Sequence, residues 1–480
     1  MTIRMNVLFT HGYFLGEDPK EQAIMKPYPP LGILYLSAWL ERRGVENEVF
    51  DTTFSTPEKL QQYLLEHRPR IVALYTNLMT KLNVIRIMCF IRDQTTLQNT
   101  LIVLGGPDVT HNAEDYLRCG AGLIVIGEGE QTMLEIASLF LNIEYRTANV
   151  EYRYFKNIPG LACLLPDGSL HRTAPREKLR DLDEIPLPNR QKIDLQQYLD
   201  AWKKSHGHSA VSVSTQRGCP YTCRWCSTAV YGQSYRRRSP PAVVDEIEWL
   251  QAHYDFDLIW FVDDVFTVSH KWLNEFYDEL QQRGVRVAFE CITRADRLNE
   301  EVIQTLKNCG CFRVWIGAES GSQRIIDAMD RRVDVRQVRD MIRAARQAGI
   351  QAGTFIMLGY PGETEADIRE TVEHLKASNP DLFTITVAYP IKGTGLYEEV
   401  QSTAFSALPW ADRTDRDLDF QRNYPRRYYD FAVRWTVNAV HWHKAGLAKR
   451  RFTFSGMRYF GKMWVARAGM WWWKKENRPF

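Results

Sequence analysis

The chain has 480 residues, of which 45% are hydrophobic and 25% charged, and a formal net charge of +3. This composition is ordinary for a globular protein, and the length predicts about three domains with ample chain for buried cores. The small net charge gives no reason to expect nucleic acid as a partner. Nine cysteines without a disulfide-like framework, and an N-terminus without signal-peptide architecture, indicate a cytoplasmic protein. The sequence has no run of 18 apolar residues, so we expect no membrane-spanning helix.

Short apolar strands alternate with helical stretches over the first 140 residues. The predicted strands are Asn6–Thr10, Glu48–Asp51, Ile71–Tyr75, Leu101–Leu104 and Leu123–Ile126. The predicted helices are Gly32–Arg43, Pro57–His67, Leu82–Arg92, Ala113–Cys119 and Gln131–Leu141. Such alternation predicts a parallel sheet with helices on both faces.

Three of these strands end in polar or glycine-rich segments. Ligands of open α/β sheets bind beyond the carboxyl ends of the strands, so these segments are candidate binding residues. A plain dinucleotide site is not favoured, because no GxGxxG follows the first strand. For each glycine pair the alternative is an ordinary strand-to-helix turn. The candidates are Tyr75, Thr76 and Asn77, then Gly105, Gly106 and Pro107, then Gly127, Glu128, Gly129 and Thr132.

Residues 143–205 are expected to link this domain to the next one. Leu161–Leu170 predicts a hairpin, with Pro166–Ser169 at its turn. The segment Asp181–Arg190 is acidic and contains prolines, as a linker does.

Three cysteines, Cys219, Cys223 and Cys226, follow the predicted strand Ala210–Ser214 at CxxxCxxC spacing. Thiolates are the usual ligands of iron–sulfur clusters, and a cubane cluster needs a ligand on each of its four irons. Three cysteines therefore leave one iron open for another ligand. The alternative is a structural zinc site with His206 or His208 as fourth ligand, although such sites more often use pairs of CxxC. The other six cysteines lack ligand spacing, and we expect them to be buried thiols.

Residues 206–396 predict six strands in alternation with helices. After Ala210–Ser214 the strands are Leu258–Val262, Arg286–Cys291, Arg313–Ile316, Gly353–Leu358 and Leu382–Val387. Loops at the carboxyl ends of barrel strands carry the chemistry, so the polar residues there are candidate site residues. They are Asp263 and Asp264 after the second strand, Glu290, Thr293 and Arg294 around the end of the third, and Glu319 after the fourth.

The cysteine loop and the six strands resemble the radical S-adenosylmethionine (SAM) enzymes, which carry CxxxCx(aromatic)C and a partial (β/α)6 barrel. The resemblance implies a 4Fe-4S cluster whose open iron is chelated by SAM, and an electron donor such as flavodoxin or ferredoxin. It places Asp263 and Asp264 at the SAM amino group, with capping of the next helix as the alternative. Arg294 would pair with the SAM carboxylate, or else with Asp296. Glu319 would bind the ribose hydroxyls.

The N-terminal segments resemble the cobalamin-binding domain that precedes many radical SAM cores. The matching segments are PPLG at Pro29–Gly32, GGPDVT at Gly105–Thr110 and GEGEQT at Gly127–Thr132. One departure is that the chain contains no DxHxxG, the motif whose histidine binds the lower face of cobalt. His11 and His111 lie near strand ends without that context, so we expect no protein imidazole on cobalt.

The segment from Arg434 to Lys475 has ten Lys or Arg residues, no Asp or Glu, and six tryptophans. Basic residues interleaved with aromatic ones indicate either nucleic acid or a membrane interface. Between these we favour a peripheral association with the inner membrane surface. The alternative is a helical cap over the barrel with a solvated basic side.

Together these features predict an α/β protein with four regions. They are a Rossmann-like cobalamin-binding domain at 1–142, a linker with a hairpin at 143–205, a radical SAM core at 206–396 and a helical C-terminal region at 397–480. The implied chemistry is SAM cleavage to a 5′-deoxyadenosyl radical, and methylation of an unactivated carbon of a small molecule or lipid through methylcobalamin. The alternatives are an oxidative cyclase of the magnesium-protoporphyrin monomethyl ester type, and a cobalamin-binding sensor or carrier with a structural cluster.

Overall fold

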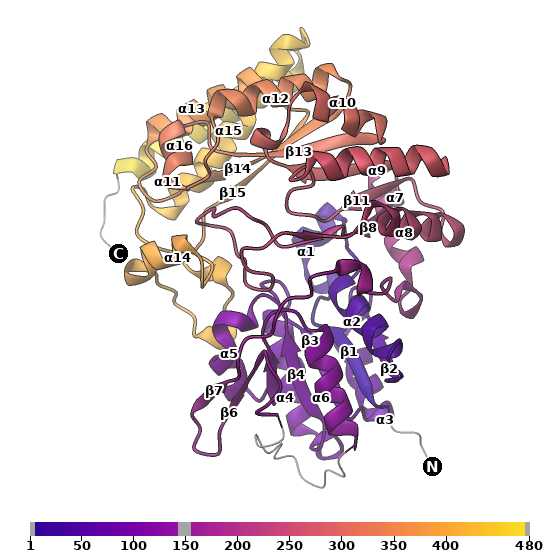
Figure 1. Cartoon of the computed structure of the whole chain (residues 1–480). Helices are drawn as coiled ribbons and strands as arrows, with labels where there is room; N and C mark the ends of the chain where they lie inside the picture. Colours follow the sequence, from indigo (N-terminus) through magenta and orange to yellow (C-terminus); the bar gives the residue numbers. More distant parts are fainter. Residues whose placement is uncertain (1–4, 143–154, 476–480) are drawn as a thin grey trace. The chain divides into compact units, whose positions relative to one another are not determined.

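The structure is a computed structural model that describes residues 5–142 and 155–475 (Figure 1). The chain divides into two compact units. The first comprises residues 1–220, 227–259 and 407–417, and the second comprises residues 221–226, 260–406 and 418–480. The two units are described in turn.

The first unit contains a seven-stranded sheet of order β2-β1-β3-β4-β5-β6-β7. Its strands are β1 (Val7–His11), β2 (Asn47–Phe50), β3 (Ile71–Tyr75), β4 (Leu101–Gly105), β5 (Leu123–Val125), β6 (Leu161–Leu164) and β7 (Leu170–Arg172). The pairs from β2 to β5 are parallel. The order reverses between β1 and β3, and ligands of doubly wound sheets bind at such a switch point.

Helices cover both faces of this sheet, as the strand–helix alternation predicted. They are α2 (Leu31–Glu41), α3 (Pro57–His67), α4 (Lys81–Asp93), α5 (Val109–Arg118) and α6 (Glu130–Asn142), preceded by the short α1 (Pro19–Ile24). Apolar side chains of α2 and α6 form one core with the sheet, and those of α3, α4 and α5 form the other. Thr56 caps α3 by accepting a hydrogen bond from the amide of Lys59, and Pro57 occupies the first turn, where its missing N–H costs nothing.

The predicted hairpin is present as β6 and β7, but it belongs to the sheet. β6 pairs antiparallel with β5 and β7 pairs antiparallel with β6, so the hairpin extends the sheet beyond its parallel part. β6 is mostly buried, because its apolar side chains complete the two cores on either side. The linker prediction therefore missed a structural role for this segment.

Two further helices of the first unit are α7 (Leu195–His206), which the sequence analysis did not predict, and α8 (Pro240–His253). Glu246 of α8 is fully buried, and its carboxylate lies 2.6 Å from the guanidinium of Arg190 and also bonds Arg238. Burial alone would raise the pKa of Glu246, but the two arginines more than offset it, so the pKa lies below the usual value. This triad stabilises the unit only while all three charges are present.

A six-stranded sheet of order β15-β14-β13-β12-β11-β8 carries the predicted barrel strands. They are β8 (Ala210–Val213), β11 (Leu258–Phe261), β12 (Ala288–Thr293), β13 (Cys311–Glu319), β14 (Gln351–Leu358) and β15 (Leu382–Val387). The pairs from β12 to β15, in the second unit, are parallel. Between them run α9 (His270–Arg283), α10 (Glu300–Asn308), α11 (Gln323–Ala328), α12 (Val335–Gln347) and α13 (Glu365–Ser378).

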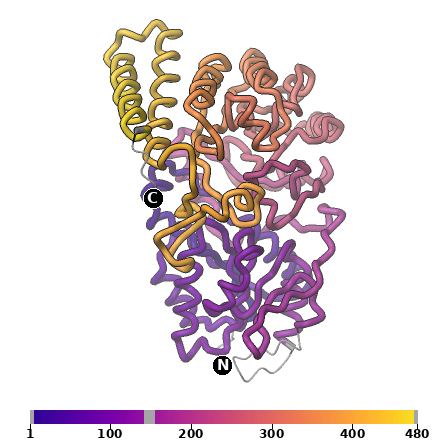
Figure 2. Tube along the Cα trace, turned by 90° about the vertical axis from the view of Figure 1, so that its left-hand side faces the viewer, coloured from indigo at the N-terminus to yellow at the C-terminus, as the bar shows by residue number. Residues whose placement is uncertain are grey.

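The C-terminal part of the second unit is helical, as predicted. After α14 (Gly395–Val400), two long helices, α15 (Arg426–Leu447) and α16 (Phe454–Lys475), pack against each other as an antiparallel hairpin (yellow in Figure 2). α15 also packs on α13 and on β15. Among the described residues, no helix is long and apolar enough to cross a bilayer.

Candidate active site

The cysteine loop begins and ends in a two-residue antiparallel ladder between β9 (Gln216–Arg217) and β10 (Arg236–Arg237). Gly218 follows with a φ of 82°, and a Cβ at this position would lie 2.4 Å from the carbonyl oxygen of Ser234. Only glycine fits such a close approach with a positive φ. The chain is therefore pinched together at the base of the loop.

Two buried ion pairs fix the base of the loop within the first unit. Arg217 bonds Glu130 at the start of α6, and Arg236 lies 2.5 Å from the carboxylate of Glu128. Glu128 also accepts a hydrogen bond from the amide of Leu179 (2.9 Å). Burial alone would raise the pKa of Glu130, but Arg217 more than offsets it and holds the pKa below the usual value. The acidic residues of the GEGEQT segment thus hold the arginines on either side of the cysteine loop.

Cys223 lies in a cationic environment inside the second unit. Its Sγ is 3.6 Å from Nη1 of Arg294 and 3.5 Å from Nη1 of Arg331, and both guanidinium groups are buried. Within the described part of the chain, Cys219, Cys223 and Cys226 are not joined by disulfide bonds. Iron–sulfur clusters are held by cysteine thiolates, whose negative charge two neighbouring guanidinium groups can balance. Cys223 is therefore suited to be a cluster ligand.

Glu319 lies beside the same cations at the carboxyl end of β13. The register between β13 and β14 shifts here by a bulge, and Glu319 has a φ of 63°. Its Oε1 is 3.8 Å from Nη2 of Arg331, and burial raises its pKa although Arg331 opposes the rise. Bulges of this kind re-aim a side chain at the rim of a sheet. Arg331 thus connects the predicted ribose-binding carboxylate to a predicted cluster ligand.

Arg294 forms an ion pair with Asp296. This pair was the alternative to the predicted pairing of Arg294 with the SAM carboxylate. Its Nε lies 2.8 Å from Oδ1 of Asp296, and its Nη2 donates to the carbonyl oxygen of Arg331 (2.7 Å). The guanidinium also lies 3.8 Å from the ring centroid of Tyr221. These contacts fix Arg294 in place, and Nη1 is the nitrogen that faces Cys223.

The remaining predicted residues of the second unit differ in their surroundings. Asp263 is buried and Asp264 is exposed, and neither caps α9, because Ser269 accepts the hydrogen bond from Trp272. Thr293 is buried and its hydroxyl bonds that of Thr267.

Glu290 is committed to two side chains of the neighbouring strand β13. Its Oε2 accepts hydrogen bonds from Arg313 (3.0 Å) and from the indole of Trp315 (3.1 Å). Its carboxylate therefore supports the sheet.

The zinc alternative gains no support. His206 has its Nε2 at 3.0 Å from the carbonyl oxygen of Ile24 and at 3.1 Å from that of Met25. Among residues 5–142 and 155–475, no three His, Cys, Asp or Glu side chains converge as one metal ion requires.

Four of the other six cysteines are buried as expected: Cys163, Cys291, Cys309 and Cys311. Cys119 is half-buried. The expectation was wrong for Cys89, which is exposed because it points away from the apolar face of α4.

The segments after β3 and β4 lie side by side in the first sheet. The amide of Thr76 donates to the carbonyl oxygen of Gly105 (2.7 Å), and Asn77 accepts hydrogen bonds from the first turn before α4. Gly106 has a φ of 115°, and a Cβ there would lie 2.3 Å from the carbonyl oxygen of Thr76. Burial raises the pKa of Tyr75, the last residue of β3, to about 12. Pro107 follows Gly106 directly. The bond between Thr76 and Gly105 and the close approach of Gly106 to Thr76 join the two segments into one edge of the sheet.

The segment after β5 and His11 of β1 lie in the same unit. Gly127 has a φ of 85°, and Gly129 packs closely on Leu36. The buried hydroxyl of Thr132 accepts a hydrogen bond from Arg176 (2.6 Å). His11 is buried, with Nε2 at 3.0 Å from Asp51 and Nδ1 at 3.0 Å from the Thr52 hydroxyl. Both ring nitrogens of His11 are thus engaged in hydrogen bonds, as expected for a histidine that binds no metal.

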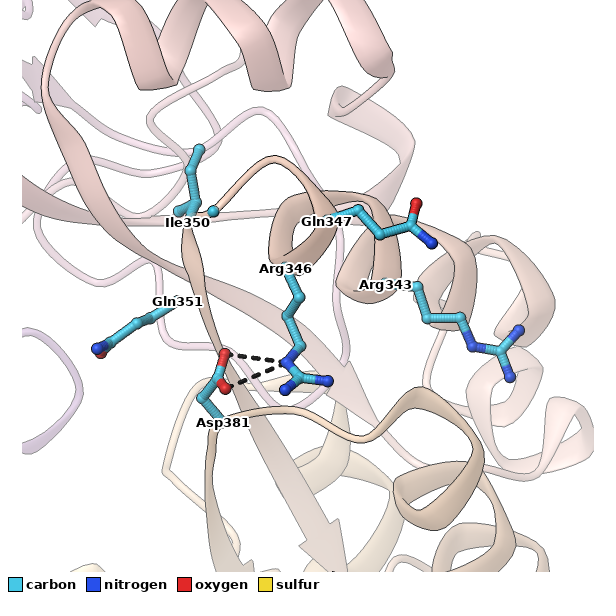
Figure 3. A pocket seen from close by; sticks show the side chains of 7 residues that line it. Arg343, Arg346, Gln347, Ile350, Gln351 and Asp381 are labelled. Carbon is cyan, nitrogen blue, oxygen red and sulfur yellow. Dashed lines mark hydrogen bonds and ion pairs between the residues drawn. The ribbon is translucent and has the colours of Figure 1, made fainter. Parts of the chain in front are cut away.

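A surface pocket of about 400 Å³ lies elsewhere in the second unit (Figure 3). Arg343 and Arg346 of α12 line it together with Gln351, the first residue of β14, and Asp381. Asp381 pairs with Nε of Arg346 at 3.1 Å, as the dashed lines in Figure 3 show. The pocket lies at the amino ends of β14 and β15, whereas Glu319 and Arg294 lie at carboxyl ends, so it is separate from the candidate site.

Comparison with known protein families agrees with both halves of this description. Residues 24–137 match the B12 binding domain, and residues 213–375 match the radical SAM superfamily. The chain is a B12-binding radical SAM protein. The radical SAM match includes all three cysteines of the loop as well as Arg294, Glu319 and Arg331. The B12 match includes the segments after β3, β4 and β5.

Known proteins are similar to this one over most of the chain. An uncharacterized methyltransferase of Pyrococcus horikoshii is 28% identical, covering 83% of this chain and 85% of the relative. The anaerobic magnesium-protoporphyrin IX monomethyl ester cyclase of Rubrivivax gelatinosus is 25% identical, covering 82% and 70%. The radical SAM methyltransferase TsrM of Kitasatospora setae, solved with cobalamin and a [4Fe-4S] cluster, superposes with a TM-score of 0.68 at 19% identity, covering 83% and 75%. TsrM therefore shares the fold of this B12-binding radical SAM protein.

Arg294 was predicted from the sequence, but three other arginines of the site were not. Arg331 contacts Cys223 and Glu319, and Arg217 and Arg236 fix the base of the loop. Arg217 and Arg236 lie before and after the three cysteines in the sequence, which was an available signal. Arg331 lies 108 residues after Cys223 in a run of charged residues, and no local pattern marks it.

Proposed function

We propose that this enzyme uses a 4Fe-4S cluster, SAM and cobalamin to methylate an unactivated carbon of a small molecule or lipid. When bound, these cofactors supply the electron, the radical and the methyl group, and the protein sets distances and excludes water. The proposed division is a cobalamin domain at 1–142, a linker at 143–205, a radical SAM core at 206–396 and a helical region at 397–480. An electron donor such as flavodoxin or ferredoxin would reduce the cluster.

The observation that carries the proposal is the placement of two guanidinium groups and Glu319 around Cys223. Arg331 contacts both the thiol and the carboxylate, at 3.5 and 3.8 Å. In the proposed enzyme Cys219, Cys223 and Cys226 hold the cluster, and Arg331 and Arg294 balance its negative charge. Glu319 orients the ribose of SAM through its carboxyl group, while Asp263 and Asp264 receive the SAM ammonium. Thr293 and Glu290 of β12 would support the sheet behind these residues through their bonds to Thr267, Arg313 and Trp315.

The first sheet would bind cobalamin at the edge formed by the segments after β3, β4 and β5. Gly106 and Gly127 have positive φ values of 115° and 85° and leave room for close approach to the backbone. The hydrogen bonds of His11 to Asp51 and Thr52 support a lower cobalt face without a protein imidazole. Paramagnetic resonance of the cobalt(II) form should then show no nitrogen splitting from a protein ligand.

The central test uses anaerobically purified and reconstituted protein. We expect it to bind about four irons, as one cubane cluster requires, and to cleave SAM to 5′-deoxyadenosine under reducing conditions. Alanine at Cys219, Cys223 or Cys226 should abolish both properties. Cys89→Ala is the matched control, because this exposed thiol lies on the outer face of α4. A variant lacking all three loop cysteines that still cleaves SAM would refute the proposal.

The second candidate is an oxidative cyclase, favoured by the similarity to the Rubrivivax gelatinosus cyclase over 82% of the chain. Incubation with methyl-labelled SAM and a cell extract, followed by mass spectrometry, separates the two functions. A labelled product indicates a methyltransferase, whereas deoxyadenosine without any labelled product indicates the cyclase type. A cobalamin-binding sensor with a structural cluster would produce neither.

A further inference from the structure

The outer face of α16 is apolar along its whole length. This face is formed by residues at helical spacing, all of them exposed: Phe454, Met457, Gly461, Trp464, Val465, Ala468, Trp471 and Trp472. The side chains of Phe454, Val465 and Trp472 are 90%, 70% and 61% exposed. A Cβ added at Gly461 would meet no heavy atom of the described residues within 4 Å. Contiguous exposed apolar surface of this kind marks an interaction site.

The opposite face of α16 packs on α15. Trp442 of α15 contacts Phe460, with ring centroids 5.2 Å apart, and His441 stacks on Tyr459. Close to the C-terminal end of α16, Arg467 and Lys474 lie 2.5 and 2.8 Å from the carboxylate of Glu365. α16 is therefore apolar on two sides while its partner α15 covers one of them.

Basic residues border the apolar face and the turn before it. Arg458 and Lys462 are exposed on one flank of α16, and Lys449 and Arg450 are exposed where α15 ends. Phe452 extends from the same turn with 89% of its side chain exposed. The sequence from Arg434 to Lys475 contains no acidic residue. Apart from Arg467 and Lys474, which pair with Glu365, the basic residues have no acidic neighbour within this segment, and the surface combines large apolar side chains with positive charge.

We propose that the outer face of α16 and the turn containing Phe452 dock on an anionic lipid bilayer. Tryptophan prefers the headgroup level, where its ring meets apolar chains and its N–H meets water. Basic residues beside an apolar helical face are attracted to anionic headgroups. A second copy of the chain would bring the same positive charges together, so charge disfavours self-association through this face. The hairpin is seen in yellow in Figure 2. The docking does not depend on the proposed function, and the two can fail separately.

The test is co-flotation of the full chain with vesicles of phosphatidylcholine, with and without one quarter phosphatidylglycerol. We expect binding only to the anionic vesicles. Binding should weaken between about 0.1 M and about 1 M KCl, because the Debye length shortens from about 10 to about 3 Å. The double variant Trp464→Ser/Trp472→Ser should bind at least about tenfold more weakly. Both side chains are exposed, so helical content by circular dichroism should be unchanged. Ile24→Ser/Leu65→Ser removes two exposed apolar residues of the first unit and should bind as the wild type does.

A second pair of variants tests the contribution of charge. Arg450→Glu/Arg458→Glu should reduce binding to anionic vesicles, whereas Lys20→Glu/Lys59→Glu makes the same change in net charge on exposed residues of α1 and α3. If both pairs of substitutions reduced binding to anionic vesicles equally, only the net charge would matter, and the proposed docking surface would be rejected. Failure of the wild type to float with anionic vesicles at low salt would also overturn the proposal. The proposal would also be overturned if light scattering showed that the wild type is a stable dimer and the Trp464→Ser/Trp472→Ser variant is a monomer.

Discussion

Replacement of Arg331 by methionine should lower the reduction potential of the cluster. Arg331 is buried, its Nη1 lies 3.5 Å from the Sγ of Cys223, and its charge opposes that of an added electron. Methionine keeps a long apolar side chain at the position. It removes the charge and the hydrogen bonds of the guanidinium to the Sγ of Cys223 and to the carbonyl oxygen of Gly317. Because burial already raises the pKa of Glu319, this carboxyl group can take up a proton when its cationic neighbour is gone.

The size of the effect follows from the geometry. For an added electron held about 6 Å from the guanidinium, beyond the Sγ of Cys223, an effective dielectric constant of about 20 would give an interaction of about 3 kcal/mol. For a one-electron couple about 1.4 kcal/mol corresponds to about 59 mV. The potential of the Arg331→Met variant should therefore lie about 125 mV below that of the wild type.

A redox titration of the reconstituted protein, followed by paramagnetic resonance, measures this potential. Arg332→Met is the matched control, because that neighbouring side chain is exposed and pairs with Asp330 (2.8 Å), so solvent screens its charge. Arg331→Lys retains the charge and should recover most of the potential. The reasoning is refuted if Arg331→Met and Arg332→Met titrate at the same potential.

Three further changes test other parts of the structure by thermal unfolding. Glu246→Gln should lower the free energy of unfolding by about 3–5 kcal/mol, because it leaves two buried arginines uncompensated. Glu248→Gln, on the exposed side of α8, should change it very little. Equal unfolding midpoints for the two variants would contradict the role of the triad. Burial raises the pKa of Glu363 to about 8 from an ordinary 4.5, so the folded state keeps a proton that the unfolded state loses between these values. Stability should therefore fall as the pH rises through this window, and Glu363→Gln should remove this dependence; an unchanged pH profile would contradict it. Gly106→Ala should destabilise by about 2–4 kcal/mol, because its Cβ would meet a carbonyl oxygen at 2.3 Å, whereas Gly16→Ala meets nothing within 4 Å and should be tolerated.

Periodicity predicted most of the elements, because each buried strand or helix face leaves a local apolar pattern. Ile71–Tyr75, Pro57–His67 and Leu382–Val387 have the predicted bounds, and the other strands and helices differ by a few residues at their ends. The hairpin Leu161–Arg172 was found, but its place in the sheet was not. Two short antiparallel strands look alike whether they stand alone or extend a sheet, since the partner strand β5 lies far away in sequence.

The cysteine loop was visible in the sequence because its ligands lie within eight residues of one another. The environment of those ligands was not. Arg294 offered two partners, SAM or Asp296, and the structure shows the pair with Asp296 at 2.8 Å. Glu290 was a candidate binding residue, yet Arg313 and Trp315 of the next strand occupy its carboxylate. Such pairings depend on strand register, which the sequence does not specify locally.

The sequence by itself therefore determined the order of domains, the three cysteines and the basic, tryptophan-rich C-terminal segment, because each is a matter of composition or short-range spacing. Only the tertiary structure decided that Arg331 reaches Cys223 from 108 residues away. It also decided which side of α16 is covered by α15 and which side, with Trp464 and Trp472, remains exposed. On a helix that is apolar all round, periodicity cannot select the buried face, and only the packing partner distinguishes the two sides.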